Sequence, residues 1–193
     1  TWDLGLDSVW EAGQIYVDEL DGDPQQEIIV TIMDGPWSLL GSGGTGRMMI
    51  FELDTVINDS AIFNVEYQDE VWSNWSGYNI SVGDLDSDGL KEIYTVGYEY
   101  FHLIVHENTG EDQYEYQTDF YVSSELYQRA NQGVLIADID NNGINEMICL
   151  TSGVNSLTGD LLTPGSFFVV EGVNDVSNLS YSNFNLFSTY AGG

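Results

Sequence analysis

Three short acidic segments of one design constrain this chain more than any other feature of its sequence. They start at residues 19, 84 and 138, align over nine residues without gaps, and each ends in a glutamate. The segments before and after each one are rich in β-branched and aromatic residues, in the short runs typical of β-strands. The sequence therefore predicts an all-β fold of repeated units, in which each acidic loop joins two strands.

Two further strands are predicted in each unit, after the strand that follows the loop. We expect four antiparallel strands per unit, the number in a β-propeller blade, and about three blades with approximate bounds 13–70, 71–126 and 127–190. The last two strands of the third unit are expected at 166–171 and 181–187. Propellers typically close with about four to eight blades. We therefore expect a partial propeller, completed by further sequence or by another chain, or an unusual closure.

Each acidic loop carries oxygen-bearing side chains at alternate positions, counted from its first acidic residue. Calcium takes about six to eight oxygen ligands, and carboxylates at alternate positions of a tight turn converge on one point. Positions 1, 3, 5 and 9 are expected to supply side-chain oxygens, and position 7 a backbone carbonyl. The predicted ligands are Glu19, Asp21, Asp23, Gln25 and Glu27 in loop 1 (19–27); Asp84, Asp86, Asp88, Leu90 and Glu92 in loop 2 (84–92); and Asp138, Asp140, Asn142, Ile144 and Glu146 in loop 3 (138–146). The sequence thus predicts up to three bound Ca²⁺ ions.

An EF-hand is the obvious alternative for acidic residues at this spacing, but it requires a glutamate at position 12 and a helix on each side. Position 12 here is Val30, Thr95 or Cys149, each within a predicted strand. The segment 82–93, Val-Gly-Asp-Leu-Asp-Ser-Asp-Gly-Leu-Lys-Glu-Ile, instead resembles the FG-GAP or VCBS repeat, the calcium-loop blade of integrin α-subunit propellers and of many secreted bacterial proteins. The resemblance extends over nearly the whole chain as a repeat layout. It implies that the ion mostly rigidifies the blade.

The three loops differ in detail. Loop 1 has Glu19 where the others have aspartate, and Pro24 at position 6, where the others have glycine. Because proline locks φ at a negative value, either Gly22 forms the turn instead, or Asp18 replaces Glu19 by a shift of one residue. Loop 3 has Asn142 at position 5, which keeps an oxygen but loses a charge. On charge alone, loop 2 is predicted to bind most tightly and loop 3 most weakly.

The net charge limits the partners of this chain. It carries 32 acidic and three basic residues, a formal net charge of -29. Such a surface repels nucleic acid and anionic lipid and attracts cations. No segment approaches the roughly 18 apolar residues of a membrane span, and the single cysteine, Cys149, is predicted to be a buried small residue. A secreted chain without disulfides needs another source of stability, and bound calcium can supply it. Calcium binding therefore predicts an extracellular or cell-surface location.

Other motifs carry less information. The segment 41–46 matches G-x-G-x-x-G, but a strand is predicted after it where a dinucleotide site needs a helix, so we expect a hairpin loop. His102 and His106 are expected to be surface residues or to pack between blades. Aromatic residues gather just before loop 2, where they either pack between blades or stack on sugars; they are Trp72, Trp75 and Tyr78.

No constellation of catalytic residues stands out in the sequence. We therefore expect an extracellular calcium-binding β-propeller module for cell adhesion, ligand or carbohydrate recognition, or surface assembly. Its partner would be a protein or glycan on a cell surface or in the extracellular matrix, with self-assembly as a further option. The resemblance also implies an alternative, part of a secreted polysaccharide lyase or hydrolase. A third interpretation is a structural subunit of a surface fibre or sheath.

Overall fold

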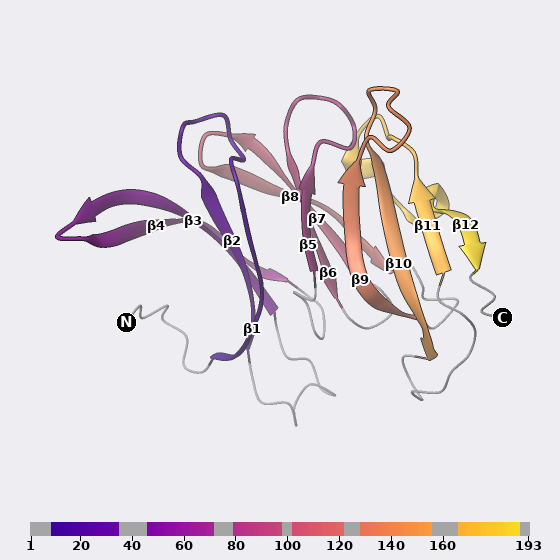
Figure 1. Cartoon of the computed structure of the whole chain (residues 1–193), viewed down its shortest axis with the longest axis horizontal. Helices are drawn as coiled ribbons and strands as arrows, with labels where there is room; N and C mark the ends of the chain where they lie inside the picture. Colours follow the sequence, from indigo (N-terminus) through magenta and orange to yellow (C-terminus); the bar gives the residue numbers. More distant parts are fainter. Residues whose placement is uncertain are drawn as a thin grey trace.

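The computed structural model describes residues 9–34, 46–71, 79–97, 102–121, 128–155 and 166–189. Three four-stranded antiparallel sheets make up this part of the chain, and each comes from one consecutive stretch of sequence (Figure 1). Sheet A contains β1 (Val9–Asp18), β2 (Glu27–Asp34), β3 (Gly46–Ile57) and β4 (Ser60–Val71); sheet B contains β5 (Asn79–Gly83), β6 (Glu92–Gly97), β7 (His102–Gly110) and β8 (Gln113–Tyr121); sheet C contains β9 (Gln128–Ala137), β10 (Glu146–Asn155), β11 (Ser166–Val170) and β12 (Asn185–Thr189). The prediction of an all-β fold is confirmed.

Within each sheet, strands that follow one another in sequence lie side by side. The three acidic loops connect the first strand of a sheet to the second, as predicted. Each loop is closed by a cross-strand pair that includes its final glutamate, and these pairs are Asp18 with Glu27, Gly83 with Glu92, and Ala137 with Glu146. The loops therefore occupy the same corner of three equivalent sheets.

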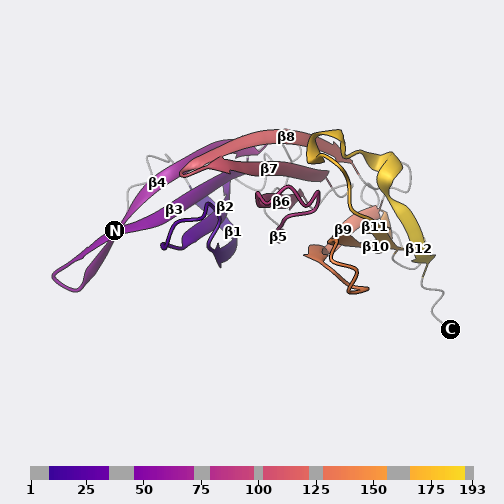
Figure 2. The same cartoon turned by 90° about the horizontal axis from the view of Figure 1, so that it is seen from above.

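The sheets stand side by side along an arc, with β1, β5 and β9 on one side and β4 and β8 on the other (Figure 2). One hydrophobic core fills the junction between sheets A and B and includes Ile29, Ile50 and Ile93. A second core fills the junction between sheets B and C and includes Tyr94 and Met147. Sheet B is thus covered on both faces, which explains why β6 is buried over its whole length, including its polar residues Glu92 and Thr95.

Both junctions use the same polar contact between neighbouring first strands. Gln14 Oε1 in β1 accepts a hydrogen bond from the backbone N–H of Ile80 in β5 at 3.2 Å. Asn79 Oδ1, at the equivalent position of β5, accepts from the N–H of Val134 in β9 at 3.0 Å. Gly133 occupies that position in β9, and a Cβ there would lie 2.1 Å from the Asn79 side chain. A glycine is therefore required where sheet C meets sheet B.

The last strand of sheet C differs from the prediction of a strand at 181–187. Residues 181–183 instead form the 3₁₀ turn η4 (Tyr181–Asn183), which follows a similar turn, η3 (Val176–Asn178). β12 begins at Asn185, so the predicted strand is confirmed only for residues 185–187. The side chain of Asn183 accepts from the N–H of Ser180 at 2.9 Å, a local bond that competes with strand pairing. Leu179, between the two turns, is buried in the core beside sheet B.

Several smaller predictions concern single residues. His102 and His106 are 2% and 1% exposed, so they are not surface residues; the ring of His106 contacts that of Tyr67 in sheet A, with centroids 5.7 Å apart. Cys149 is buried as predicted, and burial raises the pKa of its thiol. Residues 41–45 of the glycine-rich segment and the aromatic residues at 72, 75 and 78 lie outside the described residues, and Gly46 begins β3. Among those described, no helix is long and apolar enough to cross a membrane.

Candidate metal centres

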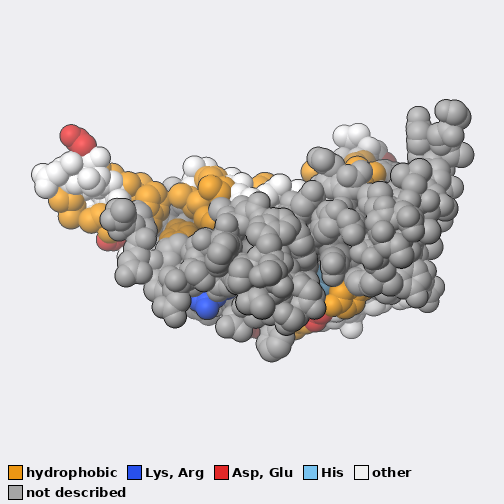
Figure 3. All heavy atoms as spheres, turned by 90° about the horizontal axis from the view of Figure 1, so that it is seen from below, with side chains coloured by type: hydrophobic (Ala, Val, Ile, Leu, Met, Phe, Trp, Pro, Cys, Tyr) orange, Lys and Arg blue, Asp and Glu red, His pale blue; other side chains and the backbone are white. Residues whose placement is uncertain are grey.

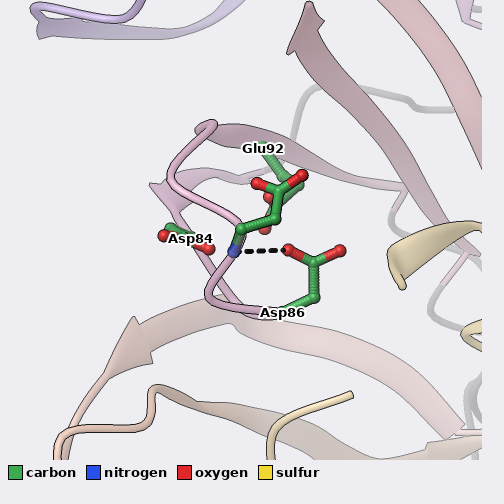
Figure 4. A group of neighbouring side chains, drawn as sticks. Asp84, Asp86 and Glu92 are labelled. Atoms are coloured by element: carbon green, nitrogen blue, oxygen red, sulfur yellow. Dashed lines mark hydrogen bonds between the residues drawn. The ribbon is translucent and has the colours of Figure 1, made fainter. Parts of the chain in front are cut away.

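Loop 2 gathers the largest group of acidic side chains. Carboxylate oxygens of four predicted ligands lie within 4.8 Å of one another; they are Asp84, Asp86, Asp88 and Glu92. Figure 4 shows three of these carboxylates around the turn between β5 and β6. Glu92 is fully buried, and its Oε2 accepts hydrogen bonds from Leu85 N–H and from the Tyr94 hydroxyl, both at 2.7 Å. Its Oε1 has no hydrogen-bond partner among the described residues.

Hydrogen bonds from the backbone of loop 2 hold these side chains in place. Ser87 and Gly89 have φ of 62° and 94°, so the chain turns sharply at positions 4 and 6. The N–H of Gly89 donates to Asp84 Oδ2 at 3.1 Å, and the N–H of Leu90 donates to Asp88 Oδ1 at 2.8 Å. Short side chains that accept from their own backbone two to five residues on are typical of Asx-type turns. The loop is therefore pre-organised around its carboxylates.

Loop 3 repeats this arrangement with one carboxylate fewer. Oxygens of Asp138, Asp140 and Glu146 lie within 4.8 Å of one another. Asn142 keeps the role of position 5 in the turn, because its Oδ1 accepts from the N–H of Ile144 at 2.7 Å. Leu90 and Ile144, the predicted carbonyl ligands at position 7, thus both donate their N–H to the position-5 side chain.

Loop 1 forms its turn differently. Position 4 has a positive φ as in the other loops, 93° at Gly22, but here its N–H donates to the Glu19 carboxylate. In the other loops the N–H of the position-6 glycine donates to the position-1 aspartate, and Pro24 at position 6 has no N–H to donate. Glu19 groups with Asp21 and Glu27, with oxygens within 4.8 Å of one another. Gln25 N–H donates to the position-5 side chain at 2.7 Å, as in the other loops.

Two acidic residues, Asp18 just before loop 1 and the predicted ligand Asp23 within it, lie outside the group of Glu19, Asp21 and Glu27. Asp18 does not join the loop 1 group; its carboxylate lies 3.5 Å from Lys91 Nζ. Asp23 groups instead with Glu27 and with Glu52 of β3, again within 4.8 Å. Glu52 was not among the predicted ligands. Its cross-strand partner is Glu27, and only this register brings it to the loop.

Burial and charge both act on the glutamate that ends each of the first two loops. Burial, with smaller contributions from Asp21 and Asp23, raises the pKa of Glu27 to about 7. Burial likewise raises the pKa of Glu92 to about 8, and the nearby Asp86 and Asp84 add to the increase. Taking a carboxylate out of water disfavours its ionised form, as do negative neighbours. A bound cation would relieve both effects, so the acidic groups fit a metal ion.

The loops also contact the next sheet through equivalent residues. Asp21 Oδ2 accepts from the N–H of Asp112, in the turn between β7 and β8, at 2.8 Å. Asp86, at the same position of loop 2, accepts from the N–H of Val176 at 3.1 Å. In loops 1 and 2 the position-3 aspartate therefore links the acidic loop to the neighbouring sheet. An ion held there would stabilise the junction as well as the loop.

Comparison of the chain with protein-family models and with curated protein sequences finds no match. The interpretation of this protein therefore depends on its acidic loops, on the sheets that present them, and on the contacts between those sheets.

Proposed function

We propose that this protein is an extracellular, calcium-stabilised module of β-propeller type that acts by binding. The observation that carries the proposal is the recurrence of one acidic loop at the same corner of three equivalent sheets, with carboxylate oxygens within 4.8 Å in each. A single exposed acidic turn is common without a metal. Three equivalent loops, each ending in a buried glutamate, are better explained by a shared ligand.

Calcium suits these groups better than other metals do. All the donor groups are carboxylates, with no histidine or cysteine among them in the described residues. Hard oxygen donors favour calcium, magnesium or manganese over zinc and copper. Calcium tolerates irregular geometry and takes several carboxylates, whereas magnesium requires near-octahedral geometry and retains its water. The loops differ in turn geometry and in charge, which favours the more tolerant ion.

The arrangement of the sheets supports the propeller-type proposal. Neighbouring sheets lie face to face through equivalent contacts, and the first strands β1, β5 and β9 share one side (Figure 2). Sheet A exposes Ile15 and Val17 of β1, and sheet C exposes Leu135 and Leu150. Apolar faces at both ends of the arc are what further blades would cover.

The hairpin of β3 and β4 supports a binding role. It projects from the end of the arc, and hydrophobic side chains cover it (Figure 3). Five large apolar residues of this hairpin are exposed: Leu53, Val56, Ile57, Ile62 and Val65. An apolar projection beside an acidic surface suits contact with another macromolecule. Adhesion to a protein or glycan, or assembly with further copies, would use such a surface.

Calcium-dependent melting tests the metal part of this proposal. The melting temperature is expected to rise markedly when calcium is added to protein prepared in EDTA, since binding to the folded state alone stabilises it. Identical melting curves in calcium and in EDTA would reject a calcium-stabilised fold.

Ligand assays separate the binding role from its alternatives. Retention on a glycan or matrix-protein array without turnover supports the binding module. Polysaccharide cleavage would instead identify an enzyme of the lyase or hydrolase class, and large calcium-dependent assemblies in solution would identify a subunit of a fibre or sheath.

A further inference from the structure

The connection between the last two strands of sheet C is longer than its equivalents in the other two sheets. β3 joins β4 through residues 58 and 59, and β7 joins β8 through residues 111 and 112. Between β11 and β12 the chain instead runs through residues 171–184, which include η3 and η4 and lie beside β8 (Figure 2). Long ordered connections in compact domains are usually functional. Because a short turn is enough to join the strands, the added residues of sheet C have another use.

This connection is anchored to the core and to loop 2. Val176 and Leu179 are 1% and 2% exposed and belong to the core between sheets B and C. The N–H of Val176 donates to Asp86 of loop 2 at 3.1 Å. Asp175 caps η3, because its Oδ1 accepts from the N–H of Ser177 at 2.8 Å. The exposed side chains of the connection therefore project from a fixed backbone.

A cleft of about 670 Å³ lies on this connection, and all of its lining residues belong to the connection. The volume falls within the range of about 300–1,000 Å³ that is typical of small-molecule sites. Six polar side chains line the cleft: Glu171, Asn174, Asp175, Asn178, Ser182 and Asn183. The residues that sheet C has in addition to a simple turn thus form a polar cavity large enough for a small ligand.

Most of these polar side chains have hydrogen-bonding groups to spare. In the part of the chain that the structure describes, the side chains of Glu171, Asn174 and Asn178 make no hydrogen bond. Asn183 accepts from the N–H of Ser180 through Oδ1, which leaves the hydrogens of its amide. An amide group offers donors and an acceptor, whereas a carboxylate offers acceptors only. The cleft therefore presents donors and acceptors side by side.

The charge of the lining narrows the class of ligand. None of the described residues that line the cleft is basic, and Glu171 and Asp175 are acidic, so a phosphate, sulfate or carboxylate ligand would be repelled. Within the described residues these two acids belong to no group of three that could hold a metal ion. Val173 is the only large apolar residue of the lining, so an apolar ligand would gain little contact. A neutral ligand with several hydroxyls fits best, because each hydroxyl can both donate and accept.

We propose that this cleft binds a neutral saccharide through Glu171, Asn174 and Asn178. Sugar hydroxyls donate to the Glu171 carboxylate and accept from the two amides. The proposal rests on the binding role proposed above and gives that role a site and a ligand class. The site is separate from the acidic loops, since none of its lining residues belongs to a loop.

The test presents the full chain with arrayed neutral oligosaccharides of glucose, mannose, galactose and N-acetylglucosamine, followed by titration calorimetry with those it retains. The wild type is expected to retain a neutral oligosaccharide and to ignore polygalacturonate and heparin, whose charges the cleft repels. The double variant Asn174→Ala and Asn178→Ala is expected to weaken binding at least about tenfold, because two hydrogen bonds to the sugar are lost. Its melting temperature is expected to equal that of the wild type, since neither side chain bonds to the described part of the chain.

Two single variants make the result specific. Glu171→Gln keeps the shape of an exposed side chain and removes its charge, so it is also expected to weaken binding without a change in melting. Asn64→Ala changes an exposed asparagine of β4, outside the cleft, and is expected to bind like the wild type.

Three results would overturn the proposal: no neutral oligosaccharide is retained, the anionic polysaccharides are preferred, or the double variant and Glu171→Gln bind as tightly as the wild type. These results are independent of the calcium test. A chain that calcium stabilises but that retains no neutral saccharide would reject the cleft alone. Saccharide binding in a chain that calcium does not stabilise would instead reject the metal part of the proposed function.

Discussion

The substitution Glu92→Gln is expected to have opposite effects on stability with and without calcium. Glu92 is fully buried, and its Oε2 accepts from Leu85 N–H and the Tyr94 hydroxyl. A glutamine oxygen can accept both bonds, and its amide can take the place of the unpaired Oε1, facing Asp84 and Asp86. The shape of the side chain is unchanged. Only the charge, and with it the ability to bind an ion strongly, is lost.

The magnitude follows from the raised pKa of Glu92. Burial raises this pKa from 4.5 to about 8 in the protein without an ion. A carboxyl whose pKa is higher in the folded state stabilises the fold fully below its unfolded pKa, and this contribution is lost as the pH rises through the folded pKa. At pH 7, protonating the side chain costs about 3 kcal/mol, at roughly 1.4 kcal/mol per pH unit above 4.5. A glutamine avoids this cost because it is always neutral.

Thermal melting at two pH values in EDTA and in calcium measures the effect. In EDTA at pH 7, Glu92→Gln is expected to raise stability by roughly 2 to 3 kcal/mol, or about 4 to 12 °C in a chain of this size. At pH 5 the gain falls to about 1 kcal/mol. In calcium the variant is expected to melt below the wild type, because the ion has lost a ligand.

A control variant and one contrary outcome distinguish an electrostatic role of Glu92 from a purely structural one. The exposed Glu115→Gln, which changes the net charge equally, is expected to shift melting little in either buffer. If Glu92→Gln instead lowers the melting temperature by the same amount in EDTA and in calcium, the glutamate is a structural hydrogen-bond acceptor and the electrostatic argument is wrong.

Three further predictions follow from other parts of the fold. In EDTA the wild type is expected to melt at a higher temperature at pH 5 than at pH 8, because the raised pKa of Glu27, about 7, makes stability fall as pH rises through that range; the opposite trend would contradict it. Gly133→Ala is expected to lower the free energy of unfolding, measured in urea, by at least about 2 kcal/mol, since φ is 83° there and the new Cβ would meet Asn79. Gly143→Ala has open space around it and is expected to lose only about 1 kcal/mol, from backbone strain. The buried thiol of Cys149 is expected to react with a thiol reagent only in denaturant.

Local features of this protein could be predicted from its sequence. The acidic loops and the strands beside them depend on residues only a few positions apart, so spacing and composition were sufficient to place them. The strand predicted at 181–187 starts too early, again for a local reason, since the hydrogen bonds around Asn183 favour a 3₁₀ turn over a strand at 181–183.

Tertiary structure decided the contacts between sheets. Glu52 approaches loop 1 because β3 pairs with β2 in one register, and Asp112 approaches Glu52 because two sheets pack face to face. The burial of His106 against Tyr67 and the need for Gly133 beside Asn79 have the same origin. The sequence by itself determined where each sheet turns and where its acidic loop lies. Only strand register and sheet packing decided which acidic residues meet across the sheets, because these contacts join residues far apart in the chain.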